Sequence, residues 1–185
     1  MDQNMMRDTE QHMDKSIEVL RHELSNIRTG RANPGIIEHL QVDYYGSPTA
    51  LQALAGISAP DSRQLIVQPY DRTALSGIEK AIRQSDLGFN PVNDGNQLRI
   101  NIPPLTEERR REMVKMAHKR VEESKVAIRN LRRDANDHVK RLRKDRQVSE
   151  DEEKLAQEQL QKLTDAAVRE ADAVGQRKEA EILEV

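Results

Sequence analysis

The sequence predicts an α+β protein: an elongated three-helix bundle with a small mixed α/β domain inserted between helix one and helix two. Apolar residues recur at helical spacings of three and four near both ends of the chain. Between residues 31 and 104 they alternate instead, as they do in strands that bury one face. Charged residues make up 34% of the chain and aromatic residues 2%, a composition that favours long helices over a β-sandwich. We therefore expect residues 1–30 and 105–185 to form the bundle and residues 31–104 the small domain.

The first helix is predicted from an apolar stripe that, from Met13 onward, follows steps of four, three, four and three. The stripe consists of Met6, Met13, Ile17, Leu20, Leu24 and Ile27. We expect the helix to end within IRTGRANPG, because Gly30, Pro34 and Gly35 interrupt a helical backbone.

The middle segment combines strand-like runs with one short helix. The strand-like runs are HLQVDYYG, RQLIVQPY and NDGNQLRINIPP, and the helix is DRTALSGIEKAIRQSD. The helix has Leu75, Ile78 and Ile82 on one face, so the segment predicts three or four strands packed with one helix. In the first strand we interpret Tyr44 as a core residue and Tyr45 as an exposed one, both with structural roles.

Two long helices are predicted after Pro103 and Pro104. The apolar stripe of the second helix is Val114, Ala117, Val121, Ser124, Ile128, Leu131, Ala135, His138 and Leu142, and that of the third is Ala156, Leu160, Leu163, Ala167, Ala171 and Val174. Ser149 and Glu152 fit a capping box that begins the third helix. No stripe can bury itself alone, so we expect a bundle whose two connections to the small domain lie at one end and form a hinge.

Charge is distributed unevenly between these helices. Residues 106–146 carry fifteen Lys and Arg against eight Asp and Glu, whereas residues 147–185 carry five against eleven. On a helical wheel centred on Ile128, the basic residues of the second helix fall on one side, between about 40° and 140°. This basic stripe consists of Lys125, Arg129, Arg132, Arg133, Lys140 and Arg143, with Asn136 among them.

Two interpretations of the basic stripe compete. A solvated flank paired with the acidic third helix needs no partner, but solubility alone favours mixed signs on one face. Arginine offers planar, bidentate contacts to phosphate, so nucleic-acid binding is slightly favoured. The scarcity of aromatic residues argues against base stacking, and contacts to the phosphates of folded RNA fit better.

Catalytic, metal and membrane roles find little support in the sequence. The chain has no cysteine, no apolar run of about 18 residues, and no GxxxxGK[ST], HExxH or GxSxG sequence. The first residues lack the apolar core of a secretory signal. We therefore expect a cytoplasmic protein that is not an enzyme and has no catalytic residue, metal site or cofactor.

Six segments, in this order, resemble the bacterial ribosome recycling factor family. They are IRTGRANP (27–34), VDYYGSPTALQALA (42–55), YDRTALSGIEKAIRQSDLGFNP (70–91), LRINIPPLTEERRREMVK (98–115), IRNLRRDAND (128–137) and SEDEEKLAQEQLQKLTDA (149–166). The resemblance covers essentially the whole chain.

This resemblance implies an L-shaped protein with a three-helix bundle and a small β/α/β domain on paired hinges. It implies a translation factor that binds the post-termination ribosome and, with elongation factor G and GTP, splits it into subunits for reuse. The bundle would lie on large-subunit ribosomal RNA (rRNA) while the small domain moves. The expected partners are the ribosome and elongation factor G, with no membrane, and the protein is expected to be a monomer.

The resemblance also implies roles for individual residues. Arg129 and Arg132 are similar to the principal rRNA contacts of the family, and Arg28 is expected to contact RNA as well. From the basic stripe we add Arg133, Lys125 and Asn136. The expected hinge residues are Gly30, Arg31, Pro103 and Pro104, where glycine gives the backbone freedom and proline restricts it.

A coiled-coil adaptor that binds proteins and never contacts RNA remains the alternative. It would show an exposed apolar groove or association through the apolar stripes, and its arginines would be paired internally with the third helix.

Overall fold

The computed structural model describes residues 3–184, and these fall into two compact units. One unit contains the chain up to Thr29 and again from Glu107, and the other runs from Gly30 to Thr106. The first unit is helical and the second contains all six strands of the described chain, so the predicted α+β class is confirmed.

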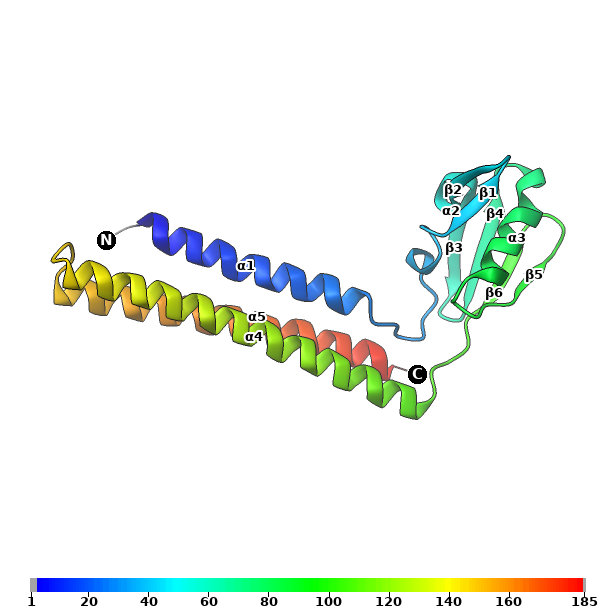
Figure 1. Ribbon diagram of the computed structural model, residues 1–185. Helices are drawn as coiled ribbons and strands as arrows, with labels where there is room; N and C mark the ends of the chain where they lie inside the picture. Colours follow the sequence, from blue (N-terminus) through cyan, green and yellow to red (C-terminus); the bar gives the residue numbers. More distant parts are fainter. Residues whose placement is uncertain (1–2, 185) are drawn as a thin grey trace. The chain divides into compact units, whose positions relative to one another are not determined.

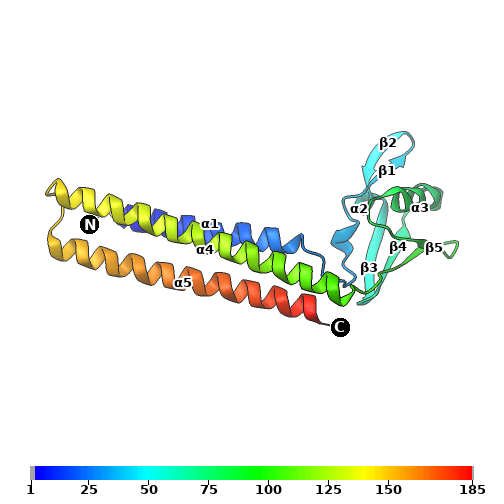
Figure 2. The same cartoon turned by 60° about the horizontal axis from the view of Figure 1, so that its bottom comes forward.

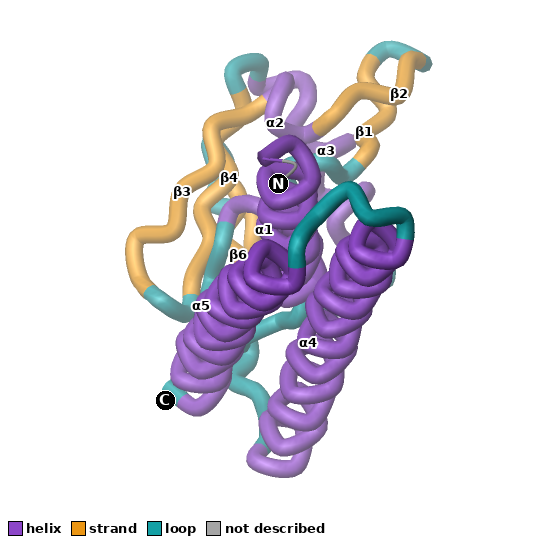
Figure 3. Tube along the Cα trace, turned by 90° about the vertical axis from the view of Figure 1, so that its left-hand side faces the viewer, coloured by secondary structure: helices purple, strands orange, loops and turns teal. Residues whose placement is uncertain are grey.

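Three helices form the first unit: α1 (Gln3–Ser25), α4 (Glu107–Lys144) and α5 (Glu150–Leu183). They lie side by side, and α4 and α5 run antiparallel on either side of a short turn (Figures 1 and 2). Viewed along the bundle, the three helices pack around a common centre (Figure 3). The capping box at the start of α5 is present, with Glu152 N donating to Ser149 Oγ and Ser149 N donating to Glu152 Oε2.

The bundle core contains the apolar stripe predicted for α1, because every residue from Met13 to Ile27 in that stripe is buried. In α4 the burial departs from the prediction near the C-terminal end, where Val139 is buried and His138 and Leu142 are only partly buried. An α-helix has 3.6 residues per turn, so a strict seven-residue repeat drifts by about 20° per heptad. Toward the end of the second heptad after Ile128, this drift brings Val139 to the core in place of His138.

Gly175 of α5 packs closely against Val121 of α4. A Cβ atom at this position would be 2.5 Å from Cγ2 of Val121 on α4, a distance at which one of the two must move. The glycine that interrupts the pattern of α5 therefore has a packing function that offsets its low helix propensity.

The second unit contains a two-stranded and a four-stranded antiparallel sheet. The strands are β1 (Gln41–Tyr44), β2 (Ser47–Ala50), β3 (Ala55–Asp61), β4 (Gln64–Pro69), β5 (Pro91–Asn93) and β6 (Leu98–Asn101), and the helices are α2 (Leu51–Leu54) and α3 (Leu75–Gln84). The larger sheet has the order β3-β4-β6-β5, and β1 pairs with β2. The prediction of three or four strands missed β2, β3 and β5, whose sequences SPTA, AGISAPD and PVN do not alternate regularly between apolar and polar residues.

The core of the small unit forms where α3 packs with the sheet strands. Register places Leu65 opposite Ile100 and Val67 opposite Leu98, so four fully buried side chains line one face of the central strands. Ile78 of α3 joins this cluster and is also completely buried. These contacts give the small unit a core of its own.

Both ends of the small unit are held at the β3–β4 turn. The backbone N–H of Ala32 donates to the carbonyl oxygen of Ser62 (2.8 Å), and that of Ile102 donates to the carbonyl oxygen of Arg63 (2.7 Å). Gly30, just before this point, has a φ of +76°, a conformation that glycine adopts without strain. Its hypothetical Cβ would lie 3.1 Å from Cγ of Leu105, so Gly30 also sits close to the second connecting segment.

Candidate nucleic-acid interface

The apolar stripe of α4 fixes the direction of its basic stripe. Ile128 and Ala135 are buried in the bundle, which turns Arg129 and Arg133 outward to solvent. Arg132 is partly buried at the edge of the core. The three arginines therefore lie within two turns of one helix, held by a packed and rigid element.

At one edge of the basic stripe, Lys125 is engaged by carboxylates. Its Nζ lies 3.0 Å from Oδ1 of Asp172 on α5 and 3.1 Å from Oε1 of Glu122, and its side chain is only 15% exposed. The hydrogen bond to Asp172, followed by the one to Glu122, raises the pKa of Lys125 above its ordinary value. The structure thus places Lys125 at the α4–α5 boundary, with its charge already compensated.

Arg132 also reaches toward α5, but its partner there is neutral. Its Nη1 donates to Oε1 of Gln161 (2.8 Å), and Nε2 of Gln161 donates in turn to Oδ1 of Asp165 (2.8 Å). The hydrogen bond to an amide orients the guanidinium without cancelling its charge. Arg132 therefore keeps its positive charge and its remaining N–H donors for another partner.

Arg129 and Arg133 make no ion pair or side-chain hydrogen bond within the described residues. Elsewhere on the stripe the cations have loose carboxylate neighbours, Asp137 at 4.0 Å from Lys140 and Glu153 at 3.8 Å from Arg143. Pairs this long and this exposed contribute little. The unneutralised charge of the stripe is therefore concentrated on Arg129, Arg132 and Arg133.

Asn136 contributes differently from the arginines. It is partly buried, and its Oδ1 atom is enclosed without a hydrogen-bond partner within the described structure. A buried amide oxygen of this kind is poorly placed to bind an anion, since the oxygen is an acceptor. Of the predicted interface residues, Asn136 and Lys125 are therefore engaged within the bundle and are the least available to an anion.

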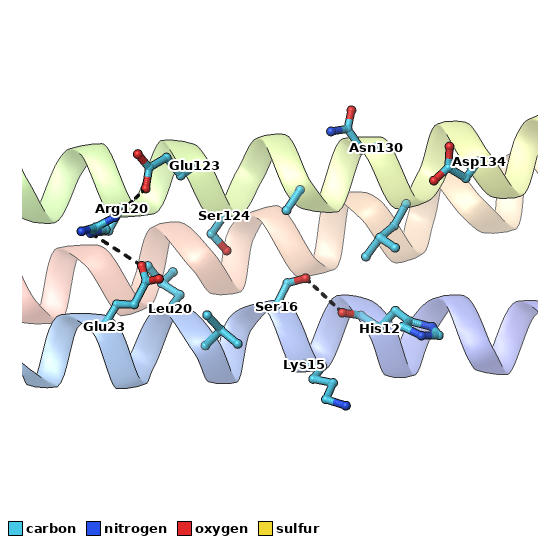
Figure 4. A pocket seen from close by; sticks show the side chains of 13 residues that line it. His12, Lys15, Ser16, Leu20, Glu23, Arg120, Glu123, Ser124, Asn130 and Asp134 are labelled. Atoms are coloured by element: carbon cyan, nitrogen blue, oxygen red, sulfur yellow. Dashed lines mark hydrogen bonds and ion pairs between the residues drawn. The ribbon is translucent and has the colours of Figure 1, made fainter.

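The opposite flank of α4 carries acidic groups beside a groove of about 590 Å³ between α1 and α4. Asp134, Glu123 and Glu23 line this groove, and Arg120 bridges two of them at 3.0 Å from Glu123 and 3.7 Å from Glu23 (Figure 4). Asp134 and Glu123 thus lie on a different side of α4 from Arg129, Arg132 and Arg133. The positive charges of these three arginines therefore stay together on one side of the helix.

The other predicted residues lie away from the basic stripe. Arg28 follows the end of α1 and is exposed, whereas Arg129 lies 22 residues into α4, roughly 30 Å from its start. Arg31, Pro103 and Pro104 are exposed in the segments that enter and leave the small unit. The structure therefore does not combine Arg28 and the α4 arginines into one compact site.

The sequences of known proteins match this chain over almost its whole length. The family model described as ribosome recycling factor matches residues 20–183. The chain is 58% identical to the ribosome-recycling factor of Thermomicrobium roseum, with 98% of each chain covered, and 55% identical to that of Heliobacterium modesticaldum, with 97% of each covered. The chain belongs to the ribosome recycling factor family.

Solved structures of the family have the same fold. A solution structure of the ribosome recycling factor matches with a TM-score of 0.74 and 42% identity, covering 98% of this chain and 97% of that one. Models for the T. thermophilus ribosome recycling factor and the E. coli elongation factor G, bound to the E. coli post-termination complex, match with a TM-score of 0.62 and 51% identity over 98% of each chain. The resemblance seen in the six sequence segments is confirmed.

Two properties of the described chain bear on its other predicted roles. Its helices, from residue 3 to residue 184, are not apolar over a length that would cross a membrane. Within the same residues, no three His, Asp or Glu side chains gather closely enough to hold a metal ion.

Sequence reasoning missed the partners that divide the basic stripe. Asp172 and Gln161 occupy equivalent faces of α5, eleven residues apart, opposite Lys125 and Arg132. A wheel of α5 aligned antiparallel to α4 would have placed both beside the stripe. The register between the two helices, which decides which cation meets which partner, depends on packing such as that of Gly175 against Val121.

Proposed function

We propose that this protein is a translation factor that binds the post-termination ribosome and, together with elongation factor G and GTP, separates its subunits for reuse. Family membership supports the process, and a 51% identical relative has been placed with elongation factor G on a post-termination complex. The observation that carries the mode of binding is the group of three α4 arginines without carboxylate partners, Arg129, Arg132 and Arg133.

In this proposal the bundle grips large-subunit rRNA through phosphate contacts. Arg132 is pre-oriented by Gln161, so it loses less side-chain freedom on binding, while Arg129 and Arg133 add exposed charge. Each contact with a phosphate releases counterions, so ribosome affinity falls steeply with salt concentration. The nearly rigid helix keeps the spacing of the arginines fixed against folded RNA.

The small unit supplies the moving part of the proposed mechanism. Hydrogen bonds hold Ala32 and Ile102 to the β3–β4 turn, so both segments are fixed to the small unit from those residues inward. We place the hinge outside these anchors, at Gly30 and Arg31 on one segment and at Pro103 and Pro104 on the other. Elongation factor G hydrolyses the GTP in this scheme, and our protein acts in the cytoplasm as a non-enzymatic monomer.

The first test compares ribosome splitting by the wild type and by an Arg129→Ala/Arg132→Ala variant. Light scattering follows the dissociation of post-termination ribosomes in the presence of elongation factor G and GTP. A matched control, Lys119→Ala/Arg141→Ala, removes two exposed cations of α4 that lie outside the stripe. We expect the stripe variant to lose most splitting activity with an unchanged helical circular dichroism spectrum, and the control to behave as the wild type.

Two outcomes would contradict the proposal. Absence of splitting by the wild type would refute the function itself. Equal activity of the stripe variant and the control, with the wild type active, would refute the role of the arginines and leave the function standing.

The adaptor alternative retains one observation in its favour. The groove between α1 and α4 has Val19, Leu20 and Leu131 in its lining, and Val19 is exposed. Against it, the arginines at the centre of the stripe are not paired with carboxylates of α5, as that alternative required. A wild type that binds no ribosomes but captures a helical protein would favour the adaptor.

A further inference from the structure

The turn between β1 and β2 places a tyrosine where the backbone disfavours one. Tyr45 has a φ of 51° and Gly46 a φ of 79°, and the flanking Tyr44 and Ser47 are paired across the hairpin. Two consecutive positive φ values in a two-residue loop define a type I′ turn, for which Asn-Gly is the favoured sequence. A bulky aromatic residue with positive φ is an outlier that costs stability.

The tyrosine at this strained position is held in one orientation. Its ring packs edge-on against the ring of Tyr44, with centroids 4.6 Å apart and planes at 70°. Its hydroxyl lies 3.2 Å from Oγ1 of Thr73, while the Tyr44 hydroxyl donates to Oδ2 of Asp71 (2.9 Å). The backbone N–H of Thr73 donates to Oδ1 of Asp71 (2.9 Å), so both hydroxyls bond to the segment that precedes α3.

These contacts orient Tyr45 without burying it. Its exposed fraction is 80%, so the ring adds little to the core of the small unit. Asparagine would fit the same backbone better, which means that folding alone does not explain the tyrosine. An exposed aromatic side chain that is already oriented by contacts such as these loses less entropy on binding, as hot-spot residues of protein interfaces do.

We infer that Tyr45 and the adjoining turn are a preformed anchor by which the small unit docks onto a protein surface. The inference rests on the proposed function, because the recycling complex supplies the partner. The partner's chemistry is an apolar pocket that accepts a tyrosine ring and has a neutral or basic rim.

The charges near Tyr45 favour a protein partner over RNA. The carboxylate of Asp43 accepts from the N–H of Gly46, and that of Asp71 accepts from the hydroxyl of Tyr44, so the turn and its immediate contacts carry two anions. Arg72, between Asp71 and Thr73, directs its guanidinium to the carbonyl oxygen of Gly95 (3.5 Å). Residues 30–106 carry six Lys and Arg against seven Asp and Glu, so this unit lacks the excess of cations that phosphate binding needs.

The first arm of the test uses Tyr45→Asn, which removes the ring and relieves the backbone. The matched control is Tyr70→Asn, which removes another exposed tyrosine (75%) of the same unit that has no positive φ. We expect Tyr45→Asn to melt within about 3 °C of the wild type or above it, and to split ribosomes about tenfold more slowly. Tyr70→Asn and Tyr45→Phe should split at the wild-type rate.

A lowered melting temperature of Tyr45→Asn would overturn the inference, because the ring would then serve folding. Equal splitting rates for Tyr45→Asn and Tyr70→Asn would also overturn it. Because the wild type is measured alongside, failure of the proposed function appears separately as a wild type that does not split ribosomes.

The second arm identifies what contacts the ring. A benzophenone amino acid at position 45 is irradiated in purified post-termination complexes with elongation factor G, and the adduct is digested with protease or nuclease. A protease-sensitive adduct with one defined protein supports the inference. A nuclease-sensitive adduct, or none in complexes that still split, refutes it.

Discussion

Lys125 and Arg129 are one helical turn apart on α4, yet their surroundings assign them different tasks. Lys125 is 15% exposed and bonded to Asp172 and Glu122, whereas Arg129 is exposed and has no such partner in the described structure. A cation that already has two carboxylates has little to gain from a phosphate. Local pairing, and not charge alone, therefore decides which residues of the basic stripe are available.

This contrast predicts opposite phenotypes for two alanine variants. Arg129→Ala should weaken ribosome binding by about tenfold and leave thermal stability unchanged. It should also reduce the slope of the logarithm of the binding constant against the logarithm of salt concentration by about one. Lys125→Ala should lower the free energy of unfolding by about 1 kcal/mol and bind ribosomes almost normally. Sedimentation at several salt concentrations and chemical denaturation measure the two effects. The reverse pattern would show that Lys125 is the RNA contact.

The hydrogen bonds that Asp71 accepts from Thr73 and Tyr44 make the stability of the small unit depend on pH. Hydrogen bonds from Thr73 N–H, the Thr73 side chain and Tyr44 lower the pKa of Asp71 below its ordinary 3.8. Its contribution is therefore present above pH 3.8 and lost as the pH falls through the lowered value. The bond to Asp71 raises the pKa of Tyr44 above its ordinary 10.0, so that contribution is present below pH 10.0 and lost above it.

All three tyrosines lie in the small unit, so tyrosine fluorescence reports its melting selectively. We expect the melting temperature followed by this signal to fall below about pH 4. Asp71→Asn should reduce the acid-side decline. An identical acid decline in that variant would assign the effect to other carboxylates.

At the scale of elements, small residues set the spacing of α4 and α5. Gly175 faces Val121, and the buried Ala117, Ala156 and Ala171 also lie on these two helices. Close approach of the helices brings Asp172 and Gln161 within reach of the basic stripe. The packing of one helix pair therefore determines which cations of the basic stripe are neutralised.

Gly175→Ala tests this close approach. The added methyl group gains up to about 1 kcal/mol of helix propensity but overpacks against Val121 at a cost of about 1–3 kcal/mol, so we expect net destabilisation. Adding Val121→Ala should recover about 1–2 kcal/mol relative to the sum of the single changes. Denaturation of the four proteins of this cycle gives the coupling, and strictly additive effects would contradict the contact.

At the scale of the whole molecule, two units with separate cores are joined by two segments. The cores share no residue, and each unit can keep its packing while the segments change conformation. Gly30 has a positive φ in the first segment, which makes this position sensitive to any side chain. A proline at position 30 would require a φ near −65°. Gly30→Pro would therefore change the backbone conformation of the segment and would not simply make the existing conformation more rigid.

Gly30→Ala is the milder test of the proposed hinge, and Gly88→Ala is its control. Gly88 also has a positive φ (+70°) but lies within the small unit, with no other atom near a hypothetical Cβ. Each variant should lose about 1 kcal/mol of stability through backbone strain. We expect Gly30→Ala to bind ribosomes normally and split them several-fold more slowly, while Gly88→Ala splits at the wild-type rate. Indistinguishable splitting rates would argue against a hinge at Gly30.

The sequence alone determined the helices and the family, because each rests on local periodicity or on contiguous segments. The stripe from Met13 to Ile27 and the capping box at Ser149 needed only the spacing of neighbours along one helix. The family segments likewise lie within single stretches of chain.

Only the tertiary structure decided which charges are neutralised and which aromatic ring is fixed. Lys125 and Arg132 differ because Asp172 and Gln161 stand opposite them, 47 and 29 residues away in sequence. Tyr45, which the sequence assigned a structural role, is held by Thr73 in a strained turn and exposed. Partners so distant along the chain meet only when packing sets the register between elements, and no periodicity within one element specifies that register.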